Sequence, residues 1–242
     1  MANSFFKFKQ FTVHQDRTAM KVTTDSCLFG AWVADTIVKQ GIADTRILDI
    51  GTGTGLLPLM VAQQTKGQIE AIELDPAAFE QATANKEQSP WLERITVQQA
   101  DARQLELQPV YDIMISNPPF YEKELKSDKS AAKNVAHHDD GLLWSDLVSI
   151  IEKGLTAEGI FFLLLPAKRM HEAMQLFNTS PLFVRQLVKV RPSEKHDCFR
   201  IMISGGRARE GAIAVSELAI KGMDEQYTKS FTELLSSYYL NL

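Results

Sequence analysis

The sequence predicts an α/β protein with a doubly wound, mostly parallel sheet that has an antiparallel edge. Three observations indicate this fold. From residue 46 onward short apolar runs alternate with longer helix-like segments, a glycine-rich turn joins the first run to its helix, and strand-like runs with short connections fill the last third. Such alternation favours right-handed crossovers and helices on both faces of a parallel sheet. We expect residues 1–242 to form a single domain, with 1–45 as a lead-in.

Five runs rich in Ile, Val, Phe and Leu are predicted as strands buried on both faces, at 46–50, 68–74, 94–98, 111–116 and 159–165. Helices are predicted at 26–38, 56–65, 76–88, 142–155 and 225–239. Pro76 follows Asp75, an arrangement typical of a capped first helical turn. The runs 182–190, 199–204 and 214–220 have short connections, which favour antiparallel pairing at one side of the sheet.

The composition of the 242 residues, 45% hydrophobic with a net charge of −4, is that of an ordinary globular protein. No apolar run approaches the roughly 20 residues of a membrane span, and the first residues lack the layout of a secretory signal. We therefore expect a cytoplasmic protein without a membrane partner. Cys27 and Cys198 lack metal-type spacing, and His137-His138 has no accompanying ligand pattern, so we expect no metal. The acidic net charge argues only weakly against RNA binding.

A glycine-rich loop follows the first predicted strand and opens a helix. After Asp49 the loop carries Gly51, Gly53 and Gly55, which let the backbone turn tightly and approach a ligand at the helix N-terminus. The spacing is G-x-G-x-G. A dinucleotide-binding fingerprint would read G-x-G-x-x-G, and a P-loop would end in Gly-Lys-Ser/Thr. The spacing therefore argues against an NAD-dependent dehydrogenase and an NTPase without excluding either.

Acidic residues stand at the ends of the next strands. Glu73 closes the second strand, where an ionised carboxylate can accept hydrogen bonds from two ribose hydroxyls. Asp75 begins a helix and is better suited to capping it. Asp101 follows the third strand, just before Ala102, where a carboxylate or the backbone can contact an adenine edge. Each acid alone is more typical of a cap or a solvated loop. Their succession at strand ends, where open α/β sheets bind ligands, favours a binding site.

The tetrapeptide Asn117-Pro118-Pro119-Phe120 directly follows the fourth strand. Its two prolines stiffen the chain and remove two amide donors, leaving the Asn117 side-chain oxygen and backbone carbonyls as a cluster of acceptors. Such a cluster suits a planar amino group, and Phe120 offers a flat face on which a base can stack. By itself the tetrapeptide is equally typical of an exposed proline turn. Its position after the glycine loop and the acids favours an active site.

The ordered set of these motifs resembles the class I S-adenosylmethionine-dependent methyltransferases of the N6-adenine type. The resemblance spans most of the chain and implies a Rossmann-like methyltransferase fold with a seven-stranded sheet. It implies S-adenosyl-L-methionine as cofactor and S-adenosyl-L-homocysteine as product. It implies cofactor contacts at Asp49, Gly51, Gly53, Gly55, Glu73, Asp101, Ala102 and Asn117. It also implies catalytic roles for Asn117, Pro118 and Phe120, and substrate contacts at Pro119, Phe120 and Tyr121.

The segments 6–13 and 20–26 resemble the lead-in of the bacterial tRNA(Val) adenine-37 N6-methyltransferases. This family has Gly-Thr-Asp where the present chain has Thr23-Thr24-Asp25, a departure that leaves the local backbone shape open. The resemblance implies a tRNA substrate, with adenine 37 of tRNA1(Val) as the target, and it places Lys21 and Thr24 near the methionine end of the cofactor. A plainer alternative is that these two residues cap the following helix. We expect the enzyme to be a monomer.

Cations on several segments are candidates for RNA contacts. The segment 121–141, which follows Phe120, is long and polar, and is either a substrate loop or a solvated lysine-rich loop. The candidates are Lys7, Lys9, Arg17, Lys123, Lys126, Lys129, Lys133, Arg191, Lys195, Arg200, Arg207 and Arg209.

Two other functions fit part of the pattern. Guanine N2 and a glutamine carboxamide are also planar amino groups, so an rRNA guanine-N2 or a protein-glutamine N5 methyltransferase is the main alternative. A non-catalytic nucleotide-binding or RNA-binding module is the alternative from another class. The intact Asn117 and Phe120 argue against it.

Overall fold

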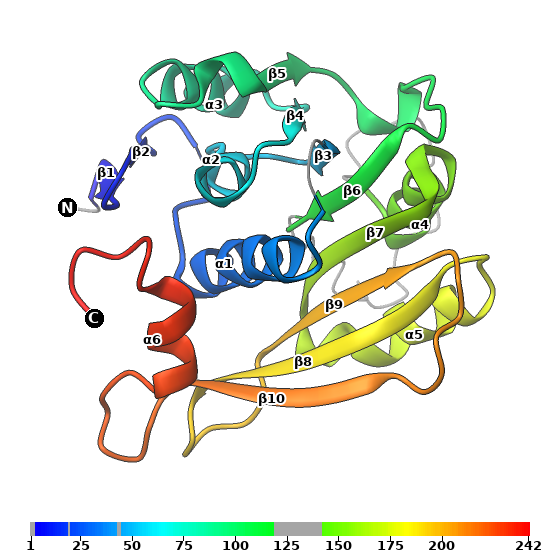
Figure 1. The fold of residues 1–242 in the computed structure, drawn as a ribbon. Coiled ribbons are helices and arrows are strands. Elements are labelled where there is room, and N and C mark those ends of the chain that lie inside the picture. The colour runs from blue at the N-terminus through cyan, green and yellow to red at the C-terminus, as the bar shows by residue number, and fades with distance from the viewer. Residues whose placement is uncertain (1–2, 19, 43–44, 119–141) are drawn as a thin grey trace, which may run out of the picture.

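The computed structural model describes residues 3–18, 20–42, 45–118 and 142–242. Within these ranges eight strands form one sheet in the order β10-β8-β9-β7-β6-β3-β4-β5, and two more form a separate hairpin (Figure 1). The sheet strands are β3 Arg46–Ile50, β4 Gln68–Glu73, β5 Ile95–Gln99, β6 Tyr111–Ser116, β7 Leu155–Pro166, β8 Phe183–Ser193, β9 Arg200–Gly206 and β10 Ala214–Lys221.

The mostly parallel α/β architecture is confirmed, and the eight strands of the described sheet match the eight strand-like runs of the sequence, one more than the seven that the resemblance implied. Only β9 runs antiparallel to its neighbours, β7 and β8, whereas β10 pairs with β8 in parallel. The physical reason is the insertion of β9 between β7 and β8. The chain leaves β9 at the end of the sheet where β8 begins, so a short connection delivers β10 to the free side of β8 in the same direction. The antiparallel strand is therefore not the outermost one.

Helices cover both faces of the sheet (Figure 1). The helices are α1 Thr24–Lys39, α2 Leu56–Gln64, α3 Pro76–Glu87, α4 Trp144–Gly154, α5 Met170–Asn178 and α6 Lys229–Leu235. Residues of α1, α2 and α6 pack in one hydrophobic cluster, and residues of α4 and α5 pack in a second. Along β7, Phe162 and Leu164 enter the first cluster while Phe161 and Leu163 enter the second. Burial on both faces explains why the strand reads as an unbroken apolar run.

The structure departs from the predicted helices at two places. Helix α5 was not predicted, and α6 is shorter than the expected 225–239. Thr228 caps α6 by accepting a hydrogen bond from Phe231 N at 3.2 Å, which fixes the start of the helix. Beyond Leu235 the chain turns, and Tyr238 and Tyr239 are buried instead of continuing an amphipathic helix. None of the helices in the described ranges is long and apolar enough to cross a membrane.

The lead-in and the last residues of the chain pack together. The lead-in forms the hairpin of β1 Phe5–Lys7 and β2 Thr12–His14, which the sequence did not predict. Phe8 stacks on Phe11 with ring centroids 4.4 Å apart, and Phe6 lies 5.6 Å from the ring of Tyr239. The Tyr238 hydroxyl donates to the carbonyl of Met60 in α2 at 3.0 Å. These contacts join both chain termini to the helical layer that carries the glycine loop.

Candidate active site

The predicted site residues meet where the parallel strands finish, which we call the carboxyl end of the sheet. The last residue of β3 is in register with the last residue of β6 and with the penultimate residue of β4. Gly51, Glu73 and Asn117 therefore stand side by side at one level, on strands about 4.8 Å apart. Asp101 follows β5, the next strand in the order. The strand ends that the sequence placed in line are neighbours in space.

The glycine loop has the backbone that its sequence requires. Gly51, Gly53 and Gly55 have φ values of 73°, 59° and 78°, in a region that residues other than glycine rarely adopt. A Cβ on Gly51 or Gly53 would meet nothing within 4 Å, so open space faces these two residues. At Gly55 a Cβ would lie 3.4 Å from Ala82 of α3, because the two helices approach closely there. The first two glycines thus face open space, and the third allows the close packing of α2 on α3.

Asp49 lies beneath this loop with an unpartnered carboxylate. The residue is 1% exposed, and neither of its oxygens has a hydrogen-bond partner in the described part of the chain. Burial raises the pKa of Asp49 to about 7. The Thr52 hydroxyl opposes this rise, although it makes no hydrogen bond of good geometry, and the Glu73 carboxylate adds to it. A buried carboxylate without a partner is costly, so the site suits a ligand that brings a cationic group close to it.

Glu73 joins the end of β4 to the glycine loop. One oxygen accepts a hydrogen bond from Gly53 N at 2.8 Å, and the other accepts from the amides of Leu74 and Asp75 at 2.9 and 3.0 Å. A carboxylate has about four acceptor positions, so one remains for a ligand hydroxyl. Asp75 caps α3 through Ala78 N at 2.8 Å, as predicted. Glu73 therefore both fixes the loop and keeps room for one ligand contact.

Asp101 is engaged by a neighbouring guanidinium. It caps the 3-10 helix Ala102–Gln104, and its oxygens accept from Arg103 Nε at 2.9 and 3.1 Å and from Arg103 Nη2 at 2.7 Å. The Arg103 side chain holds the pKa of Asp101 below its usual range. Ala102 is buried beside the carboxylate. A contact of this carboxylate with an adenine amino group would have to share oxygens with Arg103, so the adjacent backbone is the freer contact.

Asn117 emerges half-buried from the end of β6, followed by buried Pro118. The Ser116 hydroxyl donates to the carbonyl of Ile50 at 2.7 Å, which ties the end of β6 to the end of β3. This bond holds Asn117 at the level of the glycine loop. Pro119, Phe120 and Tyr121, to which the resemblance assigns substrate contacts, lie outside the described residues, and their roles stay predictions.

Lys21 and Thr24 each contact another part of the chain: Lys21 contacts the lead-in, and Thr24 contacts the C-terminal segment. The Lys21 ammonium donates to the carbonyl of Gln15. Thr23, not Thr24, caps α1, sharing a capping box with Ser26. Thr24 lies beside the Tyr239 hydroxyl. Their predicted contacts with the cofactor therefore remain predictions.

Sequence reasoning gave no role to Ser116 or Leu74. Ser116 is fully buried at the end of an apolar strand, and a serine directly before Asn117 was the available signal. Leu74 was assigned to the second strand, but β4 ends at Glu73 and Leu74 is 54% exposed at the carboxyl end of the sheet. An exposed leucine beside a ribose-type carboxylate offers an apolar face to a flat base. The exposure of Leu74 can be recognised only once the structure shows that β4 ends at Glu73.

The candidate RNA-contacting cations divide between the two ends of the sheet. Arg200 opens β9 at the carboxyl end and binds Asp25 of α1 at 2.7 Å. Arg207 lies just past the other end of β9, where its guanidinium donates to the carbonyls of Glu152 and Leu155. Arg209 follows in the same connection. Arg207 and Arg209 therefore lie at the end of the sheet opposite the candidate site, and their predicted contacts with RNA stay predictions. The two ends of β9 lie at opposite ends of the sheet, which separates Arg200 from Arg207.

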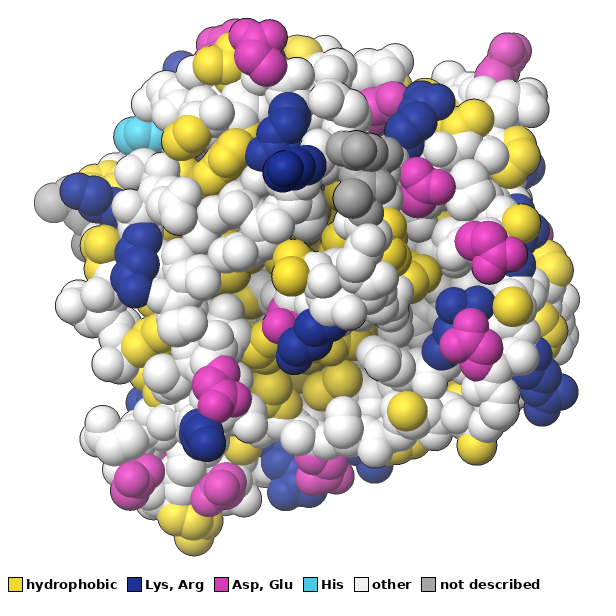
Figure 2. All heavy atoms as spheres, viewed as in Figure 1, with side chains coloured by type: hydrophobic (Ala, Val, Ile, Leu, Met, Phe, Trp, Pro, Cys, Tyr) yellow, Lys and Arg dark blue, Asp and Glu magenta, His cyan; other side chains and the backbone are white. Residues whose placement is uncertain are grey.

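Other candidate cations are paired with acids or carbonyls. Lys9 donates to the carbonyl of Ser236 at 2.6 Å, and Arg17 lies 3.4 Å from Glu80. Arg191 and Lys195 pair with Glu217 and Glu225 at 2.7 and 2.9 Å. On the face drawn in Figure 2, Lys and Arg side chains alternate with Asp and Glu and do not form one patch. The lysines of 121–141 lie outside the described residues.

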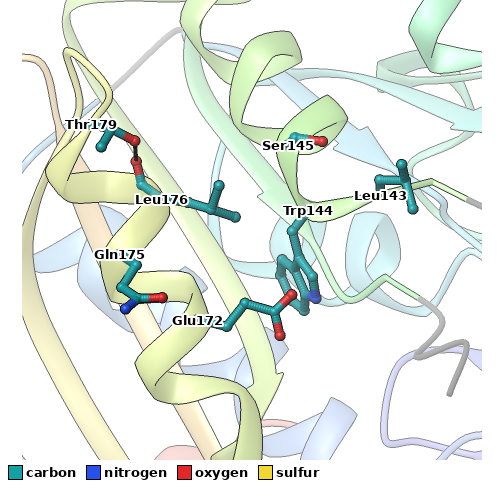
Figure 3. A pocket seen from close by; sticks show the side chains of 7 residues that line it. All are labelled: Leu143, Trp144, Ser145, Glu172, Gln175, Leu176 and Thr179. Carbon is teal, nitrogen blue, oxygen red and sulfur yellow. Dashed lines mark hydrogen bonds between the residues drawn. The ribbon is translucent and has the colours of Figure 1, made fainter. Parts of the chain in front are cut away.

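A separate groove runs between α4 and α5, and Figure 3 shows the Trp144 indole projecting toward α5. Helix α4 ends where β7 begins, so the first residues of α4 lie toward the carboxyl end of the sheet, and α5 starts at that end after β7. The groove between the two helices therefore begins at the carboxyl end of the sheet. Its lining residues are Leu143, Trp144, Ser145, Glu172, Gln175, Leu176 and Thr179. Within the described ranges no cluster of three or more His, Cys, Asp or Glu is arranged to hold a metal ion.

The model of the methyltransferase small domain family matches residues 31–156. A protein from Dyadobacter fermentans is 41% identical over 98% of both chains, and one from Cytophaga hutchinsonii is 37% identical over the whole of both. A third, from Yersinia pseudotuberculosis, is 37% identical over 98% of this chain and 92% of its own. Each is named tRNA1(Val) (adenine(37)-N6)-methyltransferase. This chain belongs to that family. The resemblance predicted from the glycine loop, the tetrapeptide and the lead-in is thereby confirmed.

Solved structures agree on the fold of this family member. One is described as a predicted O-methyltransferase from Agrobacterium tumefaciens, with a TM-score of 0.67, 18% identity, and coverage of 90% of this chain and 100% of that one. A second is geranyl diphosphate C-methyltransferase from Streptomyces coelicolor, with a TM-score of 0.53, 11% identity, and coverage of 74% and 79%. At these identities the likeness shows the Rossmann-like methyltransferase fold alone.

Proposed function

We propose that this protein transfers the methyl group of S-adenosyl-L-methionine to N6 of adenine 37 in tRNA1(Val). One observation carries the proposal. Asn117 stands at the level of Gly51, held there by the Ser116 bond to β3, in a chain that matches full-length relatives named for this reaction. An amino-group acceptor and a nucleotide-type loop thus meet at one end of the sheet.

The residues at the carboxyl end of the sheet fit the cofactor. The unpaired Asp49 carboxylate suits the ammonium of its methionine moiety, and the open space before Gly51 and Gly53 admits a ligand close to the backbone. The free acceptor position of Glu73 suits a ribose hydroxyl. Leu74 and the backbone at Ala102 would border the adenine. When bound, the cofactor supplies an electrophilic methyl group on a sulfonium.

The chain contributes position and desolvation to the reaction. The side-chain oxygen of Asn117 would accept a hydrogen bond from one hydrogen of the adenine amino group, and the carbonyl of Pro118 would accept one from the other hydrogen. Held in this way, the nitrogen lone pair is turned toward the methyl group. A C–N bond forms as the S–C bond breaks, releasing S-adenosyl-L-homocysteine and one proton. The protein needs no metal for this displacement.

The substrate also fixes where the protein works. An adenine beside the anticodon lies in a single-stranded loop, so extruding it costs less than breaking a duplex pair. We infer a cytoplasmic protein, because the proposed substrate is tRNA; the monomer expected from the sequence stays a prediction.

The test is to incubate the protein with radiolabelled cofactor and, in parallel, total tRNA, rRNA and protein from a strain lacking the activity, and then to map the label. We expect label in N6-methyladenosine at position 37 of tRNA1(Val). Label confined to rRNA guanine or to protein glutamine would favour the other amino-group methyltransferases and overturn the proposal. Binding of NAD without binding of S-adenosyl-L-homocysteine would overturn the cofactor assignment.

A further inference from the structure

Two buried amide side chains on α3 bind the lead-in. Gln81 and Asn85, one helical turn apart, are 3% and 1% exposed. The Gln81 side-chain oxygen accepts a hydrogen bond from Arg17 N at 3.2 Å. The Asn85 side chain accepts from His14 N at 2.9 Å and donates to His14 O at 2.7 Å. Both residues thus hold backbone of the segment that precedes α1.

Asn85 makes one bond that Gln81 does not. Its Nδ2 also donates to the carbonyl of Thr54 in the glycine loop, at 2.8 Å. An amide nitrogen has two hydrogens, and Asn85 uses one on the lead-in and one on the loop. Within the described residues it is therefore a direct polar link between His14 and Thr54. The contacts come from residues 71 and 31 positions away along the chain.

The loop needs such support because of its own sequence. Thr54 stands between Gly53 and Gly55, and glycine loses more conformational freedom on ordering than any other residue. Glu73 restrains the loop from the sheet side by accepting from Gly53 N at 2.8 Å. Asn85 restrains it from the helix side through Thr54 O. The two bonds act on peptide groups 52–53 and 54–55, on either side of the peptide group that joins Gly53 to Thr54, and together they restrain the orientation of the loop.

We infer that Asn85 is a positioning residue for the cofactor-binding loop, tying it to the lead-in so that the loop is ordered before the cofactor arrives. Ordering a loop in advance lowers the entropy lost on binding, which raises affinity without any contact between Asn85 and the ligand. The inference deepens the proposed function and rests on it for the identity of the ligand. The effect on the loop itself does not depend on that identity.

The experiment compares Asn85→Ala with Gln81→Ala. Both variants lose a buried amide that binds the lead-in, but only Asn85→Ala frees the loop carbonyl. We expect Asn85→Ala to weaken binding of S-adenosyl-L-homocysteine roughly 10-fold, equivalent to about 1.4 kcal/mol, as measured by calorimetry. Gln81→Ala should stay within about twofold of wild type. The KM for tRNA should change little in either variant.

A second readout needs no ligand. We expect hydrogen exchange at the amides of 51–55 in the unliganded protein to quicken in Asn85→Ala and not in Gln81→Ala. If Asn85→Ala folds poorly, Asn85→Asp keeps an acceptor for His14 N while losing the donors to His14 O and to Thr54 O, and it should show the same faster exchange. Equal effects of the Asn85 and Gln81 variants, or lowered stability with unchanged exchange and affinity, would overturn the inference. Faster exchange together with no methylation of tRNA would support Asn85 as a positioning residue and count against the proposed function.

Discussion

Replacing Asp49 with asparagine tests whether the buried carboxylate is kept for a cationic ligand group. Asp49 is 1% exposed and has no hydrogen-bond donor in the described ranges, and burial raises its pKa from 3.8 to about 7. An acid whose pKa is raised in the folded state is ionised at a cost to folding. Its contribution to stability is therefore full below the unfolded pKa and is lost as pH rises through the folded value. Asparagine is neutral at every pH and carries no such dependence.

The magnitude follows from the two pKa values. At 1.36 kcal/mol per pH unit, a folded pKa of about 7 against 3.8 corresponds to about 4 kcal/mol at alkaline pH. About 2 kcal/mol of this develops between pH 5.5 and pH 8.5. We expect the free energy of unfolding of the wild type to fall by about that amount relative to Asp49→Asn across this range, as measured by urea titration of the ligand-free proteins.

The same variant should lose cofactor affinity while it gains stability. Only the ionised carboxylate offers a counter-charge to the ammonium of S-adenosyl-L-homocysteine. The wild-type dissociation constant should therefore rise about 30-fold from pH 8.5 to pH 5.5, the change in the ionised fraction for a pKa of about 7. The variant should bind weakly with little pH dependence. A stability difference between the two proteins that does not change with pH would refute the reasoning, as would equal affinities at pH 8.5.

Three further outcomes are expected. Asn117→Ala should abolish turnover and leave S-adenosyl-L-homocysteine binding largely intact by calorimetry; loss of both would make the residue structural. Ser116→Ala should lower the free energy of unfolding by about 1 kcal/mol in urea, because it removes the buried donor to Ile50 O, and an unchanged midpoint would contradict this. Arg207→Ala should lower the melting temperature, because its guanidinium binds the last carbonyls around α4. The KM for tRNA and its salt dependence should not change, and a flatter salt dependence would restore Arg207 to the RNA surface.

The sequence by itself determined the features that depend on local chemistry. Apolar runs without alternation predicted the parallel strands β3, β6 and β7, since burial on both faces removes the need for polar positions. The run at 94–98 also forms a strand, but β5 lies at the edge of the sheet and is largely exposed, so its predicted burial on both faces is wrong. Glycines at 51, 53 and 55 predicted a loop that only glycine can form, and all three have positive φ. Asp75 followed by Pro76 predicted the start of α3 to the residue. The active site predicted at the tetrapeptide after β6 stays a prediction, and the second half of the tetrapeptide lies outside the described residues.

The tertiary structure alone decided what depends on where the chain returns. The sequence contains β10, but only the insertion of β9 between β7 and β8 makes it an eighth strand parallel to β8. The sequence shows an arginine at 207, but only the direction of β9 places it at the end of the sheet opposite the candidate site. Only packing shows that Asp49 has no hydrogen-bond partner among the described residues. The link from His14 to Thr54 through Asn85 joins residues far apart in the chain. Backbone preferences act within a few residues, whereas hydrogen bonding and burial are settled only when distant segments have packed.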